Sequence, residues 1–167
     1  KRLIDKGIPV IDFDTRIVPE GEDIGLWTFM TPDHEKLAEQ ATEMICQAIG
    51  GKGKVVHTQG ALAHSGAQLR AKGFHTVVAK YPEIEVIDEQ PADWDINKAG
   101  QIWDDLLVRY DQIDGSFCHN DDMAIGAKRV DNELERRPDV HPAVHHHQRR
   151  RAAWPRFAPG RQVVAQA

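Results

Sequence analysis

The sequence predicts an α/β fold built on an open parallel sheet. From residue 33 to residue 130, short apolar runs alternate with longer amphipathic segments of helical periodicity. Strands that alternate with helices imply right-handed crossovers and a parallel sheet with helices on both faces. A hydrophobic fraction of 41% and a charged fraction of 28% are typical of soluble globular proteins and exclude a disordered or fibrous class.

The predicted elements follow one another in a regular order. Residues 8–13 are apolar and follow a glycine, so we expect them to form a buried strand, and residues 24–29 form a second extended segment after a polar loop. Later strands are expected over residues 54–60, 84–90 and 115–118, and helices over residues 33–51, 65–82, 96–110 and from residue 120 onward.

Helical periodicity predicts which helix faces are buried. In residues 33–51 the apolar positions at helical spacing are Leu37, Ala41, Met44, Ile45 and Ala48. In residues 96–110 they form the clearest stripe of the chain: Ala99, Ile102, Trp103, Leu106, Leu107 and Tyr110.

The alternating pattern stops after Val130. Residues 131–167 contain a run of three arginines, a run of three histidines and four prolines, with no strand pattern and no sustained helical period. We therefore expect this tail to be disordered or foreign to the fold, as a frameshift or a misjoined gene end would make it. It holds 7 of the 21 Lys and Arg residues and 4 of the 26 Asp and Glu residues, so it carries +3 and leaves −8 on residues 1–130.

Composition also limits the class of partner. An acidic body argues against nucleic-acid binding. No apolar run approaches the roughly 20 residues that cross a bilayer, and no signal peptide is recognisable near Lys1, where the chain begins like the interior of a longer protein. Cys46 and Cys118 match no zinc or redox spacing, so we expect free, buried thiols.

Polar residues follow several predicted strands where each one ends. In an open parallel sheet, ligands bind outside the carboxyl ends of the strands. Carboxylate, amide and guanidinium groups bind hydroxyls, and an indole offers an apolar face to C–H groups, so a polyhydroxylated ligand is indicated. The residues at these junctions are Asp14 and Arg16 after residues 8–13, Arg70 after residues 54–60, Trp94 after residues 84–90 and Asn120 after residues 115–118.

Each candidate also has a purely structural interpretation. Asn120 could cap the last helix, and for Asp121 and Asp122 we favour a place in its first turn over ligand contact. Arg70 could be a surface ion-pair partner, and Trp94 could pack over its loop.

No catalytic, metal or cofactor site is predicted. No GxSxG, P-loop or GxGxxG motif occurs. The histidines His57, His64, His75 and His119 lack the i, i+4 spacing of a helical metal-binding pair, which favours ordinary core or surface roles.

Five motifs follow one another along the chain: GIPVIDFDT, GGKGKVVHTQG, SGAQLRAKGF, QPADWD and DLLVRYDQIDGSFCHNDDMAIGA. In this order and with near-correct spacing, they resemble the type I periplasmic sugar-binding proteins, the ribose-receptor-like solute-binding components of ABC transporters. The similarity covers about residues 7–130. The resemblance implies two Rossmann-like lobes that hold a monosaccharide or sugar alcohol between them. It also implies a periplasmic, monomeric protein without enzymatic activity or cofactor, whose partner is a transporter permease.

The resemblance divides the chain and assigns roles to the candidates. Residues 1–32 match the end of the N-terminal lobe and the hinge crossing, and residues 33–130 match a partial C-terminal lobe. Asp14 matches the family aspartate that binds sugar hydroxyls, while Thr15 stands where an arginine usually follows and Arg16 comes one place later. The other matches are Arg70 before GF, Trp94 as the aromatic that stacks on the ring, and Asn120 of the NDxMAxGA motif.

The first strands and helices of the N-terminal lobe, and a later FDG-type strand, have no counterpart in this sequence. In this family, the affinity for the sugar comes from the closure of two lobes around it. We therefore expect the chain alone to bind sugar weakly or not at all. Calorimetry against pentoses, hexoses and sugar alcohols tests this, and micromolar binding to any of them would contradict it.

Three other interpretations stay open at this point. A ligand-sensing domain of the lactose-repressor family shares the fold, although GGKGKVV and QPADWD favour the transport receptor. An enzyme on a flavodoxin-like fold could use His119, Asp121 and Asp122 as acid/base groups or metal ligands, but no nucleophile or cofactor loop accompanies them. The chain could also be a fragment without function.

Overall fold

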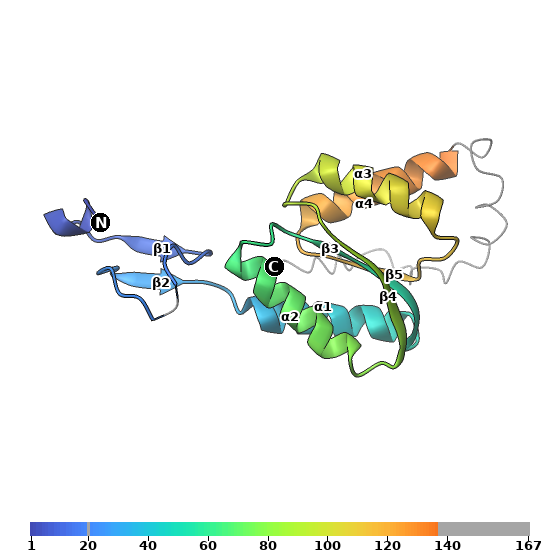
Figure 1. Cartoon of the computed structure of the whole chain (residues 1–167), viewed down its shortest axis with the longest axis horizontal. Helices are drawn as coiled ribbons and strands as arrows, with labels where there is room; N and C mark the ends of the chain where they lie inside the picture. The colour runs from blue at the N-terminus through green and yellow to red at the C-terminus, as the bar shows by residue number, and fades with distance from the viewer. Residues whose placement is uncertain (20, 137–167) are drawn as a thin grey trace, which may run out of the picture.

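The computed structural model describes residues 1–19 and 21–136, which form two parallel sheets and the helices around the larger one (Figure 1). The predicted α/β class is confirmed. The expectation for residues 137–167 lies outside the described residues. In the described part no helix is long and apolar enough to span a membrane. The elements are η1 (Ile4–Lys6), β1 (Ile11–Phe13), β2 (Thr28–Met30), α1 (His34–Ala48), β3 (Lys52–Gln59), α2 (Ser65–Val78), β4 (Glu83–Pro91), α3 (Ile96–Arg109), β5 (Gly115–Cys118) and α4 (Asp121–Arg136).

The larger sheet is organised around β3. Its strand order is β4-β3-β5, and β3 pairs in parallel with both neighbours. Residues 55–59 of β3 are all buried. An unbroken buried run of this kind is typical of a parallel strand covered on both faces. The carboxyl ends of the three strands lie at one edge, which is where the polar candidates were expected to meet.

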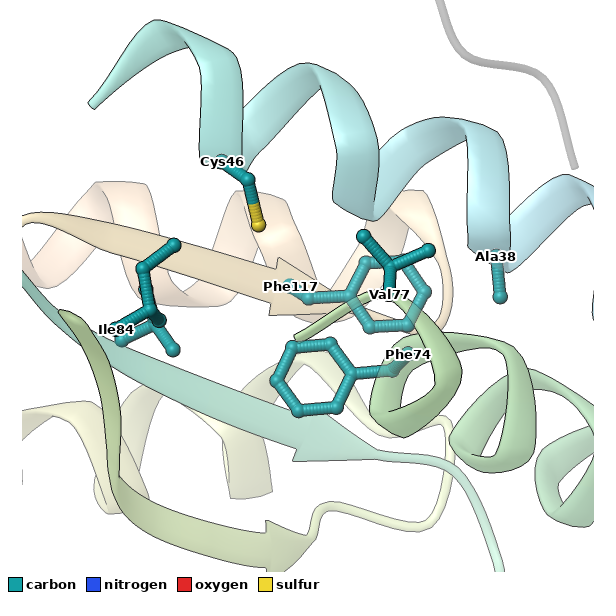
Figure 2. Close-up of a cluster of buried hydrophobic side chains, with 7 residues drawn as sticks. Ala38, Cys46, Phe74, Val77, Ile84 and Phe117 are labelled. Atoms are coloured by element: carbon teal, nitrogen blue, oxygen red, sulfur yellow. The ribbon is translucent and has the colours of Figure 1, made fainter. Parts of the chain in front are cut away.

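Helices α1 and α2 cover one face of this sheet, and α3 and α4 cover the other (Figure 1). On the first face, the rings of Phe74 and Phe117 stack with centroids 5.5 Å apart and an interplanar angle of 5°. Figure 2 shows how helices and strands both contribute to this cluster: Ala38 and Cys46 from α1, Phe74 and Val77 from α2, Ile84 from β4 and Phe117 from β5. The cluster fixes both helices to the sheet.

On the second face the predicted stripe of α3 is confirmed. Trp103, Leu106 and Leu107 pack with Val56 of β3 and with α4. Trp103 also satisfies its indole N–H, which donates to Thr58 Oγ1 at 3.1 Å. A buried tryptophan therefore adds a polar tie to the apolar contact.

The buried face of α1 is turned by one position along the helix from the predicted face. The side chains of Ala38, Thr42 and Cys46 are buried, whereas Met44 is 48% exposed. The reason is the close crossing of α1 over α2, where a Cβ on Gly73 would lie 2.4 Å from Glu35 O. Small residues must line this crossing, so larger apolar residues flank it.

Cys46 is a free buried thiol, and Cys118 is free and half-buried.

The N-terminal strands are less buried than predicted. In β1 only Asp12 is buried, while Ile11 is 55% and Phe13 71% exposed. β1 pairs in parallel with β2, and this pair forms a sheet of its own (Figure 1). Within the described residues no helix layer covers these strands, so their apolar side chains stay exposed.

The last helix is longer than the sequence pattern suggested. α4 continues past Val130 to Arg136. Residues 133–136 are Glu, Leu, Glu and Arg, all strong helix formers, so the apolar pattern ends before the helix does.

The contact between α3 and α4 depends on a glycine. A Cβ on Gly126 would lie 2.2 Å from Ile96 O, whereas a Cβ on Gly100 would meet nothing closer than 3.7 Å. Both glycines lie in helix interiors, where alanine is otherwise preferred by about 0.5–1 kcal/mol. We expect Gly126→Ala to lower the free energy of unfolding by about 1–3 kcal/mol, because the two helices must separate.

The matched control is Gly100→Ala, which gains the helix propensity without a clash and should leave stability equal or higher. Urea denaturation of both variants measures the difference. Equal effects of the two substitutions would contradict the close-packing explanation.

Candidate functional site

Two of the predicted ligand-binding residues meet at the carboxyl edge of the large sheet. Trp94, on the loop after β4, packs so closely on Gly60 that a Cβ there would lie 2.2 Å from its ring. The guanidinium carbon of Arg70 lies 5.3 Å from the centroid of the Trp94 ring, and the ring of His64 lies edge-on to it at 5.2 Å. Trp94 has a φ of 65°, in the left-handed region of the backbone. A bulky residue is strained in this conformation and keeps it only where the surrounding structure holds it there.

Arg70 is half-buried and incompletely paired. Burial lowers the pKa of its guanidinium, and the Asp14 carboxylate partly opposes this effect. Its Nε is buried and has no hydrogen-bond partner among the residues that the structure describes. A buried donor without an acceptor is costly, so this N–H is suited to an acceptor on a ligand.

Asp14 is held in a fixed position at the end of β1. Its backbone N–H donates to Met30 O at 2.8 Å, and its carbonyl accepts from Thr31 Oγ1 at 2.8 Å. Its φ of 69° is also in the left-handed region. These contacts turn the carboxylate toward α1 and α2, where His34 Nε2 lies 3.6 Å from Asp14 Oδ1.

A directed chain of hydrogen bonds orients the Asp14 carboxylate. His64 caps α2, because its Nδ1 accepts from Gly66 N–H at 3.1 Å. The ring proton is therefore on Nε2, which donates to Thr15 Oγ1, and Thr15 in turn donates to Asp14 Oδ2 at 3.3 Å. Thr15, at the place where the resemblance suggested an arginine, thus connects the end of β1 to α2.

Asn120 and Arg16 make contacts different from those of Asp14, Arg70 and Trp94. Asn120 Oδ1 accepts from Met123 N–H at 3.0 Å and so caps α4, which leaves Nδ2 able to donate to a ligand. Asp121 and Asp122 lie exposed in the first turn, as the structural interpretation had it. The guanidinium of Arg16 lies 4.5 Å from the centroid of the Phe29 ring in β2.

A buried histidine pair lies beneath the site. Gly60 N–H donates to His119 Nδ1 at 3.0 Å, so the proton of His119 is on Nε2 and is donated to His57 Nε2 at 2.7 Å. His57 then carries its proton on Nδ1 and donates it to Glu89 Oε2 at 2.8 Å. The partners are 62 and 32 residues apart in the sequence, so spacing alone could not reveal the chain. Both ring nitrogens of His119 are occupied, which argues against an acid/base role for this residue.

Both histidines of the pair are held neutral. Burial lowers the pKa of His57 to about 4, against the opposing effect of Glu89. Burial, followed by His57 and Arg70, lowers the pKa of His119 to about 3. Burial and Arg70 also lower the pKa of His34 beside Asp14.

Comparison with known proteins identifies the family. The family model described as periplasmic binding protein domain matches residues 1–146. The chain belongs to this family. The resemblance seen in the five motifs is thereby confirmed.

Relatives of known name are binding proteins. The chain is 34% identical over 132 residues to the xylitol-binding protein of Mycolicibacterium smegmatis, covering 78% of this chain and 37% of that protein. It is 31% identical over 126 residues to the ribose import binding protein RbsB of Bacillus subtilis, covering 75% of this chain and 39% of that protein. The chain thus spans about two fifths of the length of these relatives.

Solved structures of periplasmic binding proteins share the fold. An ABC transporter periplasmic solute binding protein from Actinobacillus succinogenes with bound D-allose matches with a TM-score of 0.75 and 29% identity, over 80% of this chain and 48% of that one. The fructose binding periplasmic domain of a hybrid two component system matches with a TM-score of 0.72 and 28% identity, over 80% of this chain and 43% of that one.

The histidine pair predicts a specific pH dependence of stability. On unfolding, His57 and His119 regain an ordinary pKa near 6.5, so the unfolded chain binds more protons than the folded chain between about pH 6.5 and about pH 3. The stability that the neutral pair contributes is fully present above about pH 6.5 and is lost as the pH falls through this range. Urea denaturation at a series of pH values measures it.

His119→Gln removes one of the two titrating groups and should make the decline with acidification shallower than in the parent chain. Glu89 and His75 beside His57 are present in both proteins, so their contributions cancel in the comparison, whereas the effect of Arg70 on His119 is removed together with His119. An unchanged slope in His119→Gln would contradict the assignment.

Proposed function

We propose that the chain is the sugar-contacting part of the substrate-binding component of a bacterial ABC transporter for a sugar or sugar alcohol. The observation that carries this proposal is the buried Nε of Arg70 beside the face of Trp94, which has no hydrogen-bond partner within residues 1–19 and 21–136. Asp14 completes the group from the end of β1, with a carboxylate oriented by Thr15. A guanidinium, a carboxylate and an aromatic face together suit a ring or chain that carries hydroxyls.

Each residue has a distinct role in the proposed contact. Arg70 donates to a ring or hydroxyl oxygen, Asp14 accepts hydroxyl protons, and Trp94 covers an apolar face of the sugar. Asn120 donates from Nδ2 while its oxygen caps α4. Arg16 is left outside this set of contacts; its guanidinium packs on the Phe29 ring of β2.

The relatives support the transport assignment over a repressor or an enzyme. Those with known names include a xylitol-binding protein and a ribose import binding protein, and one solved relative is an ABC transporter solute binding protein with D-allose bound. By this proposal the protein acts outside the cytoplasmic membrane, delivers its ligand to a transporter permease, works as a monomer and catalyses no reaction.

The test is titration of the chain with pentoses, hexoses and sugar alcohols, followed by NMR at the backbone amides of Gly60 and Asn120, which the parent and all variants retain. We expect saturable shifts at millimolar sugar for at least one ligand. Trp94→Ala should weaken that binding about 2- to 10-fold, because an aromatic contact contributes about 0.5–1.5 kcal/mol beyond its area. The control is Trp27→Ala, which removes an indole that is 72% exposed and lies outside this group.

A second pair of variants tests the guanidinium. Arg70→Lys keeps the charge but loses the planar fork, so the same sugar should bind more weakly. Arg109→Lys alters an arginine that pairs with Asp105 on the α3 surface and should bind as the parent does. Equal binding of the same sugar by the Trp94 and Trp27 variants would contradict the proposed function.

A further inference from the structure

Three side chains from separate elements converge on the α2 side of the large sheet. His57 lies on β3, Glu89 lies on its neighbour β4 as the register partner of His57, and His75 lies on α2. Glu89 Oε2 lies 2.8 Å from His57 Nδ1 and 2.9 Å from His75 Nε2. The three atoms that could bind a metal all lie within 4.8 Å of one another.

Neighbouring residues hold two of these side chains in place. The His57 ring stacks on Phe74, with centroids 4.1 Å apart and an interplanar angle of 29°. Gln59 Nε2 donates to Glu89 Oε1 at 2.8 Å, which directs the other oxygen toward the two imidazoles. Supporting contacts of this kind orient metal ligands in proteins.

We propose that His57, His75 and Glu89 bind a divalent first-row transition metal ion such as Zn²⁺ through His57 Nδ1, His75 Nε2 and Glu89 Oε2. Two imidazoles and one carboxylate are a common zinc ligand set that keeps a fourth position open. The His75 side chain is 52% exposed and that of Glu89 is 34% exposed, so an ion can enter and water can complete the coordination. Bonds of about 2.0–2.2 Å to each ligand need only small shifts, which His75 and Glu89 can make at the surface.

This site could not be predicted from the sequence, because its ligands come from three elements. An i, i+4 spacing reveals only histidine pairs on one helix, whereas here α2 supplies one histidine and two strands supply the other two ligands. The proposed metal site is separate from the candidate sugar contacts of Arg70 and Trp94, and it does not depend on the proposed function.

Metal binding requires a change of tautomer in the buried pair. A metal on His57 Nδ1 displaces the proton that this atom donates to Glu89. The proton then resides on His57 Nε2 and is donated to His119 Nε2, so the proton of His119 must move to Nδ1. A proton on His119 Nδ1 faces the Gly60 N–H, which is also a donor. The hydrogen bond from Gly60 N–H to His119 Nδ1 is therefore lost. Both rings stay neutral throughout, and no proton leaves the pair.

The experiment uses the full chain with its four tail histidines replaced, because they could bind metal themselves: His141→Gln, His145→Gln, His146→Gln and His147→Gln. After treatment with a chelator, Zn²⁺ is titrated by calorimetry. We expect one ion to bind per chain. His75→Ala changes an exposed residue and should preserve the fold while weakening zinc binding at least about tenfold.

Glu89→Gln removes the carboxylate and should weaken zinc binding as well, whereas Glu85→Gln changes an exposed carboxylate of the same strand and should bind zinc as the parent does. Far-UV circular dichroism of each variant checks that it is folded. Zinc binding of parental strength in His75→Ala would overturn the proposal.

A second readout locates the ion without any variant of the three ligands. The ¹⁵N signals of the His57 ring should change from the Nδ1–H to the Nε2–H tautomer at saturating Zn²⁺, and the Gly60 amide should shift with them. Unchanged His57 ring signals at saturation would overturn the proposal, because the ion would then bind elsewhere.

Discussion

The burial of β3 between two helix layers is the constraint on which the rest of the structure depends. Because residues 55–59 of this strand contact helices on both faces, every polar group they carry needs a partner inside the protein. Thr58 receives the Trp103 indole N–H, and His57 is hydrogen-bonded at both ring nitrogens. The apolar helix layers and the chain of hydrogen bonds through His57 and His119 therefore both follow from the burial of β3.

The sequence was sufficient to predict the elements of the large sheet and its helices. Apolar runs and helical stripes are local signals, and they placed β5 and the buried face of α3 correctly. The face of α1 was misplaced because a helix crossing, fixed by Gly73 of α2, selects small residues there. The exposure of β1 could not be predicted either, since it depends on which layers cover the strand and not on the strand's own residues.

The candidate site was predictable only in part, and for a similar reason. The rule that ligands bind at the carboxyl ends of parallel strands selected Arg70 and Trp94, which the structure brings together. His64 was missed as the residue that orients Thr15 and Asp14, because its contact with Thr15, 49 residues away in the sequence, is visible only in three dimensions. The capping role of Asn120 follows from local sequence, whereas the position of Arg16 over Phe29 follows from the pairing of β1 with β2.

The small β1–β2 sheet has a consequence for how the chain behaves in concentrated solution. Phe13 and Ile11 of β1 are 71% and 55% exposed, and Trp27, directly before β2, is 72% exposed. Exposed strands with apolar side chains readily pair with strands of another chain. Self-association through this sheet would rise with protein concentration, independently of anything that occurs at Arg70, Trp94 or the histidine pair.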